Sequence, residues 1–101
     1  MSKFIYLYKG PFKEMTPEEG AAWGAWMGNA GSALVDQGSP CGGGTVVVDD
    51  GSSGKISNIT GYSIVEAKDL KAATALTKGH PLLSGNKGLY SVEVLELIEM
   101  M

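Results

Sequence analysis

The sequence predicts an α+β domain of ferredoxin-like plan, β-α-β-β-α-β, spanning residues 1–101 as a single domain. Three observations support this plan. Residues 3–9 are dense in aromatic and β-branched side chains, residues 16–19 carry a helix-start signal, and residues 89–98 alternate between apolar and polar side chains. A length of 101 residues is typical of one domain.

The first predicted strand, residues 3–9, is apolar on both faces. Phe4, Tyr6 and Tyr8 fall on one face, and Ile5 and Leu7 on the other. A strand with two apolar faces needs cover on both sides. The helices of the chain can cover one face only, so we expect a second copy to cover the other. The sequence therefore predicts a homodimer.

The first helix is predicted to begin at Thr16 and to run to about Asp36. Thr16 is placed as the N-cap, Pro17 at the first helical position, and Glu19 where it completes a capping box. The stop is expected at residues 38–40, which read Gly-Ser-Pro.

The same helix carries one apolar stripe and one glycine face. Glycines 20, 24 and 28 lie four residues apart, which predicts close approach of a neighbouring backbone or, alternatively, room for a ligand. The stripe recurs at three- and four-residue spacing and contains Trp23, Trp26, Met27, Ala30, Ala33 and Leu34.

The remaining elements are predicted from turn signals. Residues 45–48 and 56–67 are expected to form a hairpin, because the run between them, residues 49–54, consists of turn formers. A second helix is expected over residues 68–78, closed by Gly79 and Pro81. Residues 89–98 are expected to form the last strand.

Charge and hydropathy exclude two classes of partner. The net charge is −3 and the eight basic residues are scattered, whereas nucleic-acid binding needs a basic stripe. No stretch approaches the roughly 18 apolar residues of a membrane helix. We therefore expect neither a nucleic-acid nor a membrane partner.

Cysteine and histidine usage limits the site chemistry. The one cysteine, Cys41, cannot form an intrachain disulfide, which is typical of a reducing cytosol and predicts a cytoplasmic protein. One Cys and one His are too few for a tetrahedral zinc site. Residues 51–55 fail the phosphate-loop pattern, and no cofactor is predicted.

Six residues are candidates for a site. His80, at the end of the second predicted helix, is either a general acid or base or a capping residue. Trp23 and Trp26 either line an apolar pocket or anchor the core. The phenols of Tyr6, Tyr8 and Tyr62 either face a cavity or pack at a subunit contact.

The chain resembles the YCII-related (DGPF-type) family of small bacterial proteins over nearly its whole length. The resemblance rests on five segments: residues 4–8 (Phe-Ile-Tyr-Leu-Tyr), 22–27 (Ala-Trp-Gly-Ala-Trp-Met), 34–40, 61–67 and 92–94. It implies a ferredoxin-like subunit that forms a dimeric α/β barrel. It also implies, for some members, activity on small ring compounds with a histidine–aspartate pair in a pocket.

The chain departs from the family pattern at that pair. Trp23 stands where such members carry histidine, and His80-Pro81 stands where they carry Asp-Pro. The Asp-Gly-Pro-Phe stretch is also absent. The pair is therefore not carried over to this chain.

Two functions follow as hypotheses. The first is a cytosolic homodimer that binds a small apolar or aromatic molecule in a cleft between sheet and helices, lined by Trp23, Trp26 and tyrosines. The alternative is a lyase or isomerase that acts on a small aromatic or carbonyl compound with His80 as acid or base.

Overall fold

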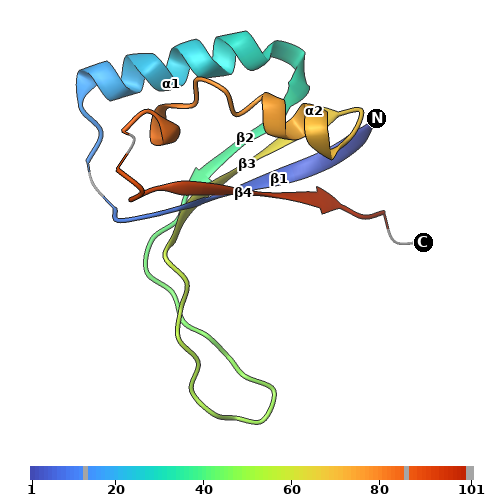
Figure 1. Ribbon diagram of the computed structural model, residues 1–101. Helices are drawn as coiled ribbons and strands as arrows, with labels where there is room; N and C mark the ends of the chain where they lie inside the picture. Colours follow the sequence, from blue (N-terminus) through green and yellow to red (C-terminus); the bar gives the residue numbers. More distant parts are fainter. Residues whose placement is uncertain (13, 86, 100–101) are drawn as a thin grey trace.

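The computed structural model describes residues 1–12, 14–85 and 87–99. It contains four strands, two α-helices and two 3₁₀ turns (Figure 1). In chain order the elements are β1 (Ser2–Lys9), α1 (Pro17–Ala30), η1 (Gly31–Ala33), β2 (Leu34–Pro40), β3 (Ile59–Ala67), α2 (Leu70–Ala75), η2 (Pro81–Leu83) and β4 (Ser91–Leu97).

The strands form one antiparallel sheet in the order β2-β3-β1-β4. The central strand β1 pairs with β3 from Ser2↔Ala67 onward and with β4 from Lys3↔Leu97 onward. This architecture confirms the predicted α+β class, and the strand order agrees with a ferredoxin-like plan.

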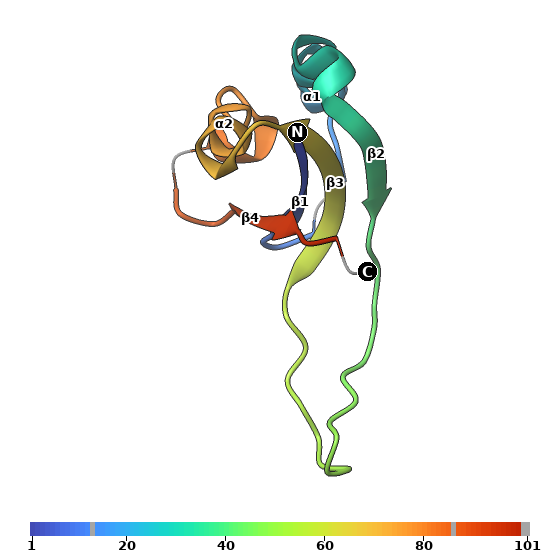
Figure 2. The ribbon, with the colours of Figure 1, turned by 90° about the vertical axis from the view of Figure 1, so that its right-hand side faces the viewer.

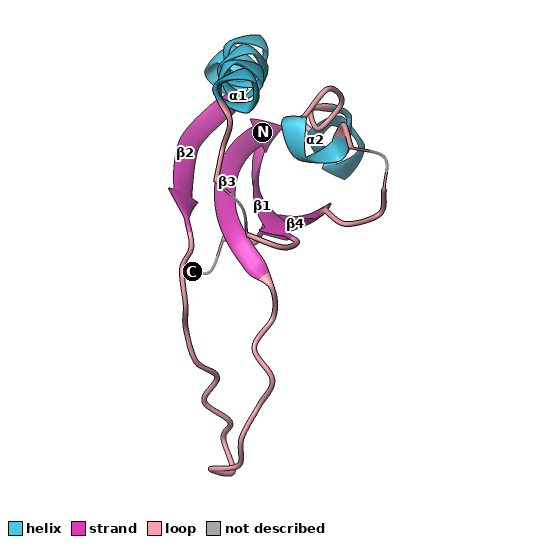
Figure 3. Ribbon diagram, turned by 90° about the vertical axis from the view of Figure 1, so that its left-hand side faces the viewer, coloured by secondary structure: helices cyan, strands magenta, loops and turns pink. Residues whose placement is uncertain are grey.

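Both helices cover the same face of the sheet (Figures 2 and 3). The residues beneath them form the core, because alternate side chains of a strand point to the same face. The core contains Phe4, Tyr6 and Tyr8 of β1, Val65 and Ala67 of β3, Trp26 of α1 and Ala73 of α2.

The opposite face of the sheet, which we call the open face, has no cover from the described part of the chain. The side chains of Ile5 and Leu7 are partly exposed there, as are those of their β3 partners Ile64 and Tyr62. On β4, Leu95 is 49% exposed and Leu97 40% exposed. The first strand is thus apolar on both faces, and only one of these is buried in the chain.

The predicted start of α1 is confirmed. The Glu19 amide donates to Thr16 Oγ1 over 3.2 Å, and the Thr16 amide donates to Glu19 Oε1 over 3.2 Å. Pro17 occupies the first helical position. The capping box satisfies two amides that a helix start would otherwise leave without partners.

Replacing the cap side chain tests its contribution. Thr16→Ala is expected to lower the free energy of unfolding by about 1 kcal/mol, because the Glu19 amide loses its acceptor. Urea denaturation followed by circular dichroism measures the change. Thr16→Ser keeps the hydroxyl and should remain close to wild type, and an equal loss in both variants would contradict the capping role.

The predicted end of α1 is wrong. The helix stops at Ala30, not near Asp36, and Gly31 follows it with a φ of +56°. That left-handed conformation is accessible to glycine at low cost and ends the helix. Leu34 then pairs with Val65 and begins the edge strand β2. Pairing with β3 outweighs the helical preference of these residues.

The predicted hairpin is also corrected. The strand that pairs with β3 is β2, residues 34–40, and not residues 45–48. Residues 41–58 extend beyond the sheet as a long connection (Figures 1 and 2). Strand β3 begins at Ile59, later than the predicted residue 56.

Gly38 permits an irregular register between β2 and β3. Its φ is +77°, and a Cβ at this position would overlap the carbonyl oxygen of Tyr62. Only glycine avoids both the strain and the overlap. One register shift lies between Leu34 and Asp36, and a second, between Asp36 and Ser39, includes Gly38.

The second half of the chain follows the predicted order with shorter elements. Helix α2 covers residues 70–75, not 68–78, with Asp69 as its N-cap. Gly79 has a φ of +81° and marks the turn away from α2. Strand β4 covers residues 91–97 of the predicted 89–98.

The glycine face of α1 points outward. Apart from neighbouring residues of the helix itself, nothing in the described part of the chain lies within 4 Å of a Cβ built at Gly20, Gly24 or Gly28. The predicted close approach of a backbone therefore does not occur among the described residues. Among the described residues, no helix has the length and apolar character needed to cross a bilayer.

Candidate functional site

Five ring-bearing residues gather between the sheet and the two helices, and we call them the aromatic cluster. Tyr6 and Tyr8 come from the central strand, where alternation directs both side chains to the covered face. Trp23 and Trp26 come from one side of α1, three residues apart. His80 comes from the segment after α2.

His80 lies at the centre of the cluster. Its ring centroid is 4.5 Å from that of Trp23, 4.5 Å from that of Trp26 and 5.0 Å from that of Tyr8. Both tryptophan contacts are edge-to-face in type, with interplanar angles of 82° and 62°. The imidazole is therefore enclosed by three aromatic side chains, and none of its surface is exposed.

The two ring nitrogens of His80 differ. Nδ1 accepts a hydrogen bond of 3.2 Å from the Leu82 amide, so His80 is the N-cap of η2. A neutral imidazole with Nδ1 as acceptor carries its proton on Nε2. Nε2 is buried and has no hydrogen-bond partner in the described part of the chain. It is a buried donor without an acceptor.

Burial also sets the charge of His80. Loss of solvation lowers the pKa of the imidazole to about 4, because burial penalises the charged form. Near neutral pH the ring is therefore uncharged. A neutral donor in an apolar surround suits an uncharged acceptor such as a carbonyl oxygen.

The two cluster tyrosines are held by hydrogen bonds. The Tyr8 hydroxyl donates to Ser63 Oγ over 2.6 Å, and the Ser63 hydroxyl donates to the Gln37 carbonyl over 2.8 Å. The Tyr6 hydroxyl donates to the carbonyl of Ala73 in α2. Burial raises the pKa of both phenols to about 12, so both stay protonated.

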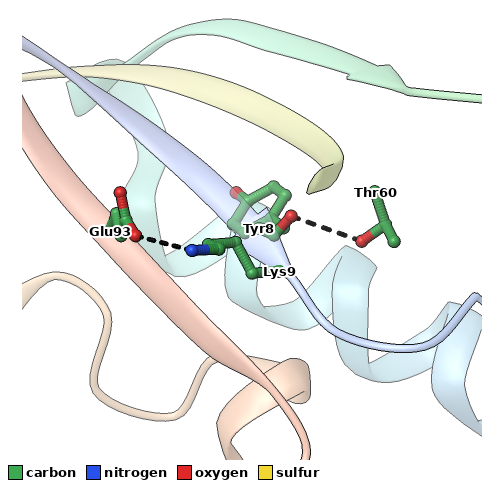
Figure 4. A network of polar contacts seen from close by, with 4 residues as sticks. All are labelled: Tyr8, Lys9, Thr60 and Glu93. Carbon is green, nitrogen blue, oxygen red and sulfur yellow. Dashed lines mark hydrogen bonds and ion pairs between the residues drawn. The ribbon is translucent and has the colours of Figure 1, made fainter. Parts of the chain in front are cut away.

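Backbone contacts fix the cluster at both ends. The Trp26 indole N–H donates to the Leu76 carbonyl over 2.8 Å, which ties α1 to the end of α2. The Thr60 hydroxyl donates to the Tyr8 carbonyl at 3.4 Å (Figure 4). Trp26 is 4% exposed, whereas Trp23 is only partly buried and forms the solvent side of the cluster.

A surface hollow begins next to the cluster. It has a volume of about 430 Å³ and is lined mainly by η2 and the loop before β4. One of its lining residues, Leu82, also packs against the core, and the Leu82 amide donates a hydrogen bond to His80 Nδ1. The described lining residues are Leu82, Leu83, Gly85, Lys87, Gly88, Leu89 and Tyr90.

The structure brings together five of the six residues named from the sequence. Tyr62 lies apart from them, because Ser63 and Val65 point to the core and Tyr62, out of phase with them, points to the open face. Ser63 was not anticipated. Its place on the buried face of β3, in phase with Val65 and Ala67, is the pattern that could have identified it.

Metal ligation has no support in the described residues. No group of three or more His, Cys, Asp or Glu side chains in that part of the chain could hold a metal ion. His80 Nδ1 is occupied by the Leu82 amide, and the cluster around Nε2 consists of aromatic rings.

Comparison with known proteins finds no relative: no protein-family model, no curated protein and no solved structure matches this chain.

Proposed function

We propose that this protein is a cytosolic homodimer that binds a small, uncharged aromatic or carbonyl compound at the aromatic cluster, between the sheet and the helices. His80 Nε2 supplies the hydrogen-bond donor, and Trp23 and Trp26 supply apolar contact. The unpaired Cys41 supports a reducing compartment.

The observation that carries the proposal is the buried donor at His80. A buried polar group without a partner costs about 1–3 kcal/mol, so its presence in a core calls for an explanation. A ligand that offers an acceptor to Nε2 would recover that free energy on binding. The surrounding rings of Trp23 and Trp26 favour a flat, apolar body next to the acceptor.

The hollow beside Leu82 supports an entry route. It has a volume of about 430 Å³ and opens on the surface beside η2. Entry of the ligand requires the side chain of Leu82, which lies between the hollow and His80, to move aside. The ligand would then lie partly in the hollow and partly against the imidazole.

The catalytic alternative, a lyase or isomerase with His80 as acid or base, has weaker support. A general acid or base works best with a pKa near the operating pH, and the pKa of His80 is lowered to about 4. The nearest phenol, that of Tyr8, already donates to Ser63. Binding without chemistry therefore accounts for the geometry more directly.

A matched pair of probes tests the proposal. Acetophenone has an aromatic ring and a carbonyl acceptor, and ethylbenzene has a similar shape without the acceptor. Quenching of tryptophan fluorescence should show acetophenone binding roughly tenfold more tightly, as expected for one hydrogen bond to a buried donor.

His80→Asn is the control variant. Asparagine keeps an acceptor for the Leu82 amide, and its own N–H donors lie nearer the backbone than Nε2 does. The variant should therefore lose most of the preference for acetophenone. If the wild-type protein does not distinguish acetophenone from ethylbenzene, or binds neither, the proposed role of His80 is wrong.

The homodimer is proposed from the open face of the sheet. Six apolar side chains there are partly or largely exposed, and a second sheet packed on them would remove them from water. The resulting dimeric α/β barrel and membership in the YCII-related family belong to the same proposal. The apolar side chains are Ile5, Leu7, Tyr62, Ile64, Leu95 and Leu97.

A further inference from the structure

Residues 41–58, which we call the arm, project away from the sheet between β2 and β3. Figures 1 and 2 show the arm continuing past the ends of both strands, and at its base the Gly10 amide donates to the Asn58 carbonyl. The extents of the molecule, 44 × 40 × 21 Å, reflect this projection. An 18-residue excursion of this kind is long for a hairpin connection, which usually has two to five residues.

The arm is an irregular hairpin with few internal bonds. An isolated bridge joins Val47 to Ser53, and the Gly51 amide donates to the Val48 carbonyl at the tip. At the base, the Cys41 amide donates to the Thr60 carbonyl. A lone two-stranded hairpin is marginal in water, so the arm needs packing from outside itself.

One side of the arm is apolar. If the register of the bridge is extended to the neighbouring residues, Gly44 lies opposite Ile56 and Val46 opposite Gly54. A Cβ at Gly54 would contact the side chains of Val46 and Val48, and a Cβ at Gly44 would contact Ile56. Val46, Val48 and Ile56 therefore share one side, which we call the valine side. Ile56 is 50% exposed and Val46 37% exposed.

The valine side continues the open face of the sheet. Lys9 points to the open face, where its ammonium lies 2.9 Å from Glu93 Oε2 (Figure 4). A hollow of about 440 Å³ is lined by Lys9 together with Lys55, Ile56, Ser57 and Asn58. Ile56 thus borders the same side of the molecule as Lys9. The open face and the valine side therefore lie on one side of the molecule, with a hollow lined mainly by polar residues between them.

The area that a stable dimer needs favours an interface made of both the open face and the arm. Four strands about 4.8 Å apart and about 25 Å long present a face of roughly 480 Å². Two arm strands about 30 Å long and about 10 Å wide add roughly 300 Å² of projected area. Stable interfaces bury about 800 Å² of accessible surface on each partner, and the arm enlarges by more than half the area that the open face can offer to a second copy.

We propose that the arm is an intersubunit clamp, which covers a second copy of this chain with its valine side and completes the interface begun by the open face. This inference rests on the proposed homodimer and adds the segment that stabilises it. It explains why apolar side chains occur on an extension that contacts its own domain only at its base.

Sedimentation equilibrium of the full chain and three variants tests the clamp. Ile56→Ser, on the valine side, should raise the dimer dissociation constant roughly tenfold or more, since one buried isoleucine contributes that much. Leu95→Ser, on the open face, should raise it similarly. Val47→Ser is the matched control, because Val47 points to the opposite side of the arm and is 90% exposed. It should leave the constant unchanged.

The possible outcomes distinguish the proposal of the clamp from the proposal of the homodimer. A dimer weakened by Leu95→Ser but not by Ile56→Ser overturns the clamp and keeps the homodimer. A wild-type chain that stays monomeric at about 100 µM, far above the Kd of a micromolar dimer, overturns both. Val46→Ser repeats the test if Ile56→Ser alters the circular dichroism spectrum, and a wild-type constant for Val46→Ser then overturns the clamp.

Discussion

Between pH 7 and pH 4 the protein is expected to lose about 3 kcal/mol of stability through His80 alone. The usual pKa of histidine is 6.5, and burial lowers it to about 4 in the folded chain. Over this pH interval His80 is therefore protonated in the unfolded chain and largely unprotonated in the folded chain. Each unit of pKa difference corresponds to about 1.4 kcal/mol. Stability is full above pH 6.5, falls as the pH drops, and levels off below pH 4.

The surroundings of His80 support this direction. Its described ring neighbours are Tyr8, Trp23 and Trp26, and the Tyr8 phenol, whose pKa is raised to about 12, stays neutral throughout. No carboxylate in the described residues accepts a hydrogen bond from Nε2. Protonation would place a charge among apolar rings without compensation.

The measurement is a series of urea denaturations between pH 4 and pH 7. His80→Asn is the control, because it removes the titrating group and retains a capping acceptor for the Leu82 amide. The acid sensitivity of the exposed Asp50, whose pKa is lowered by hydrogen bonds from Ser52, is common to both proteins and cancels. Equal pH dependence in wild type and variant would refute a buried, neutral His80.

Local rules predicted the elements that depend on neighbouring residues. The capping box at Thr16 and Glu19 requires only a three-residue spacing and is present as expected. The alternation of Phe4, Tyr6 and Tyr8 with Ile5 and Leu7 correctly divides β1 into two faces. Both patterns act within a few residues, so the sequence displays them directly.

The second strand could not be found in this way, because its pairing is nonlocal. Residues 34–40 contain Gly38, Ser39 and Pro40, which are typical of a loop, and they follow a helical stripe without a break in hydropathy. They become a strand because the edge of β3 offers hydrogen-bond partners. The valines at 46–48 have a higher strand propensity and lie in the arm.

For the candidate site, the sequence predicted the residue types and the structure determined their arrangement. The three-residue spacing of Trp23 and Trp26 places them on one side of a helix. The position of His80 at the centre of their rings depends on the turn at Gly79, which directs the chain back toward the sheet. No local pattern reports that contact.

Truncating Trp26 is expected to have the largest effect of any substitution in the cluster. Trp26 is 4% exposed, and it packs against Tyr6, Trp23 and His80. Trp26→Ala should lower the free energy of unfolding by about 3–5 kcal/mol through lost burial and the cavity left behind. Domains of this kind have about 5–15 kcal/mol in total, so the variant should be close to unfolding at room temperature.

Two further variants separate the contribution of the Trp26 ring from that of its hydrogen bond to Leu76 and from that of Trp23. Trp26→Phe keeps an aromatic ring but leaves the Leu76 carbonyl without its donor, which should cost about 1–3 kcal/mol. Trp23→Ala should cost less than Trp26→Ala, because Trp23 is already partly exposed. Guanidinium denaturation followed by circular dichroism ranks the three. If Trp23→Ala were the most damaging, the solvent side of the cluster, and not the contact between α1 and the end of α2, would hold this layer together.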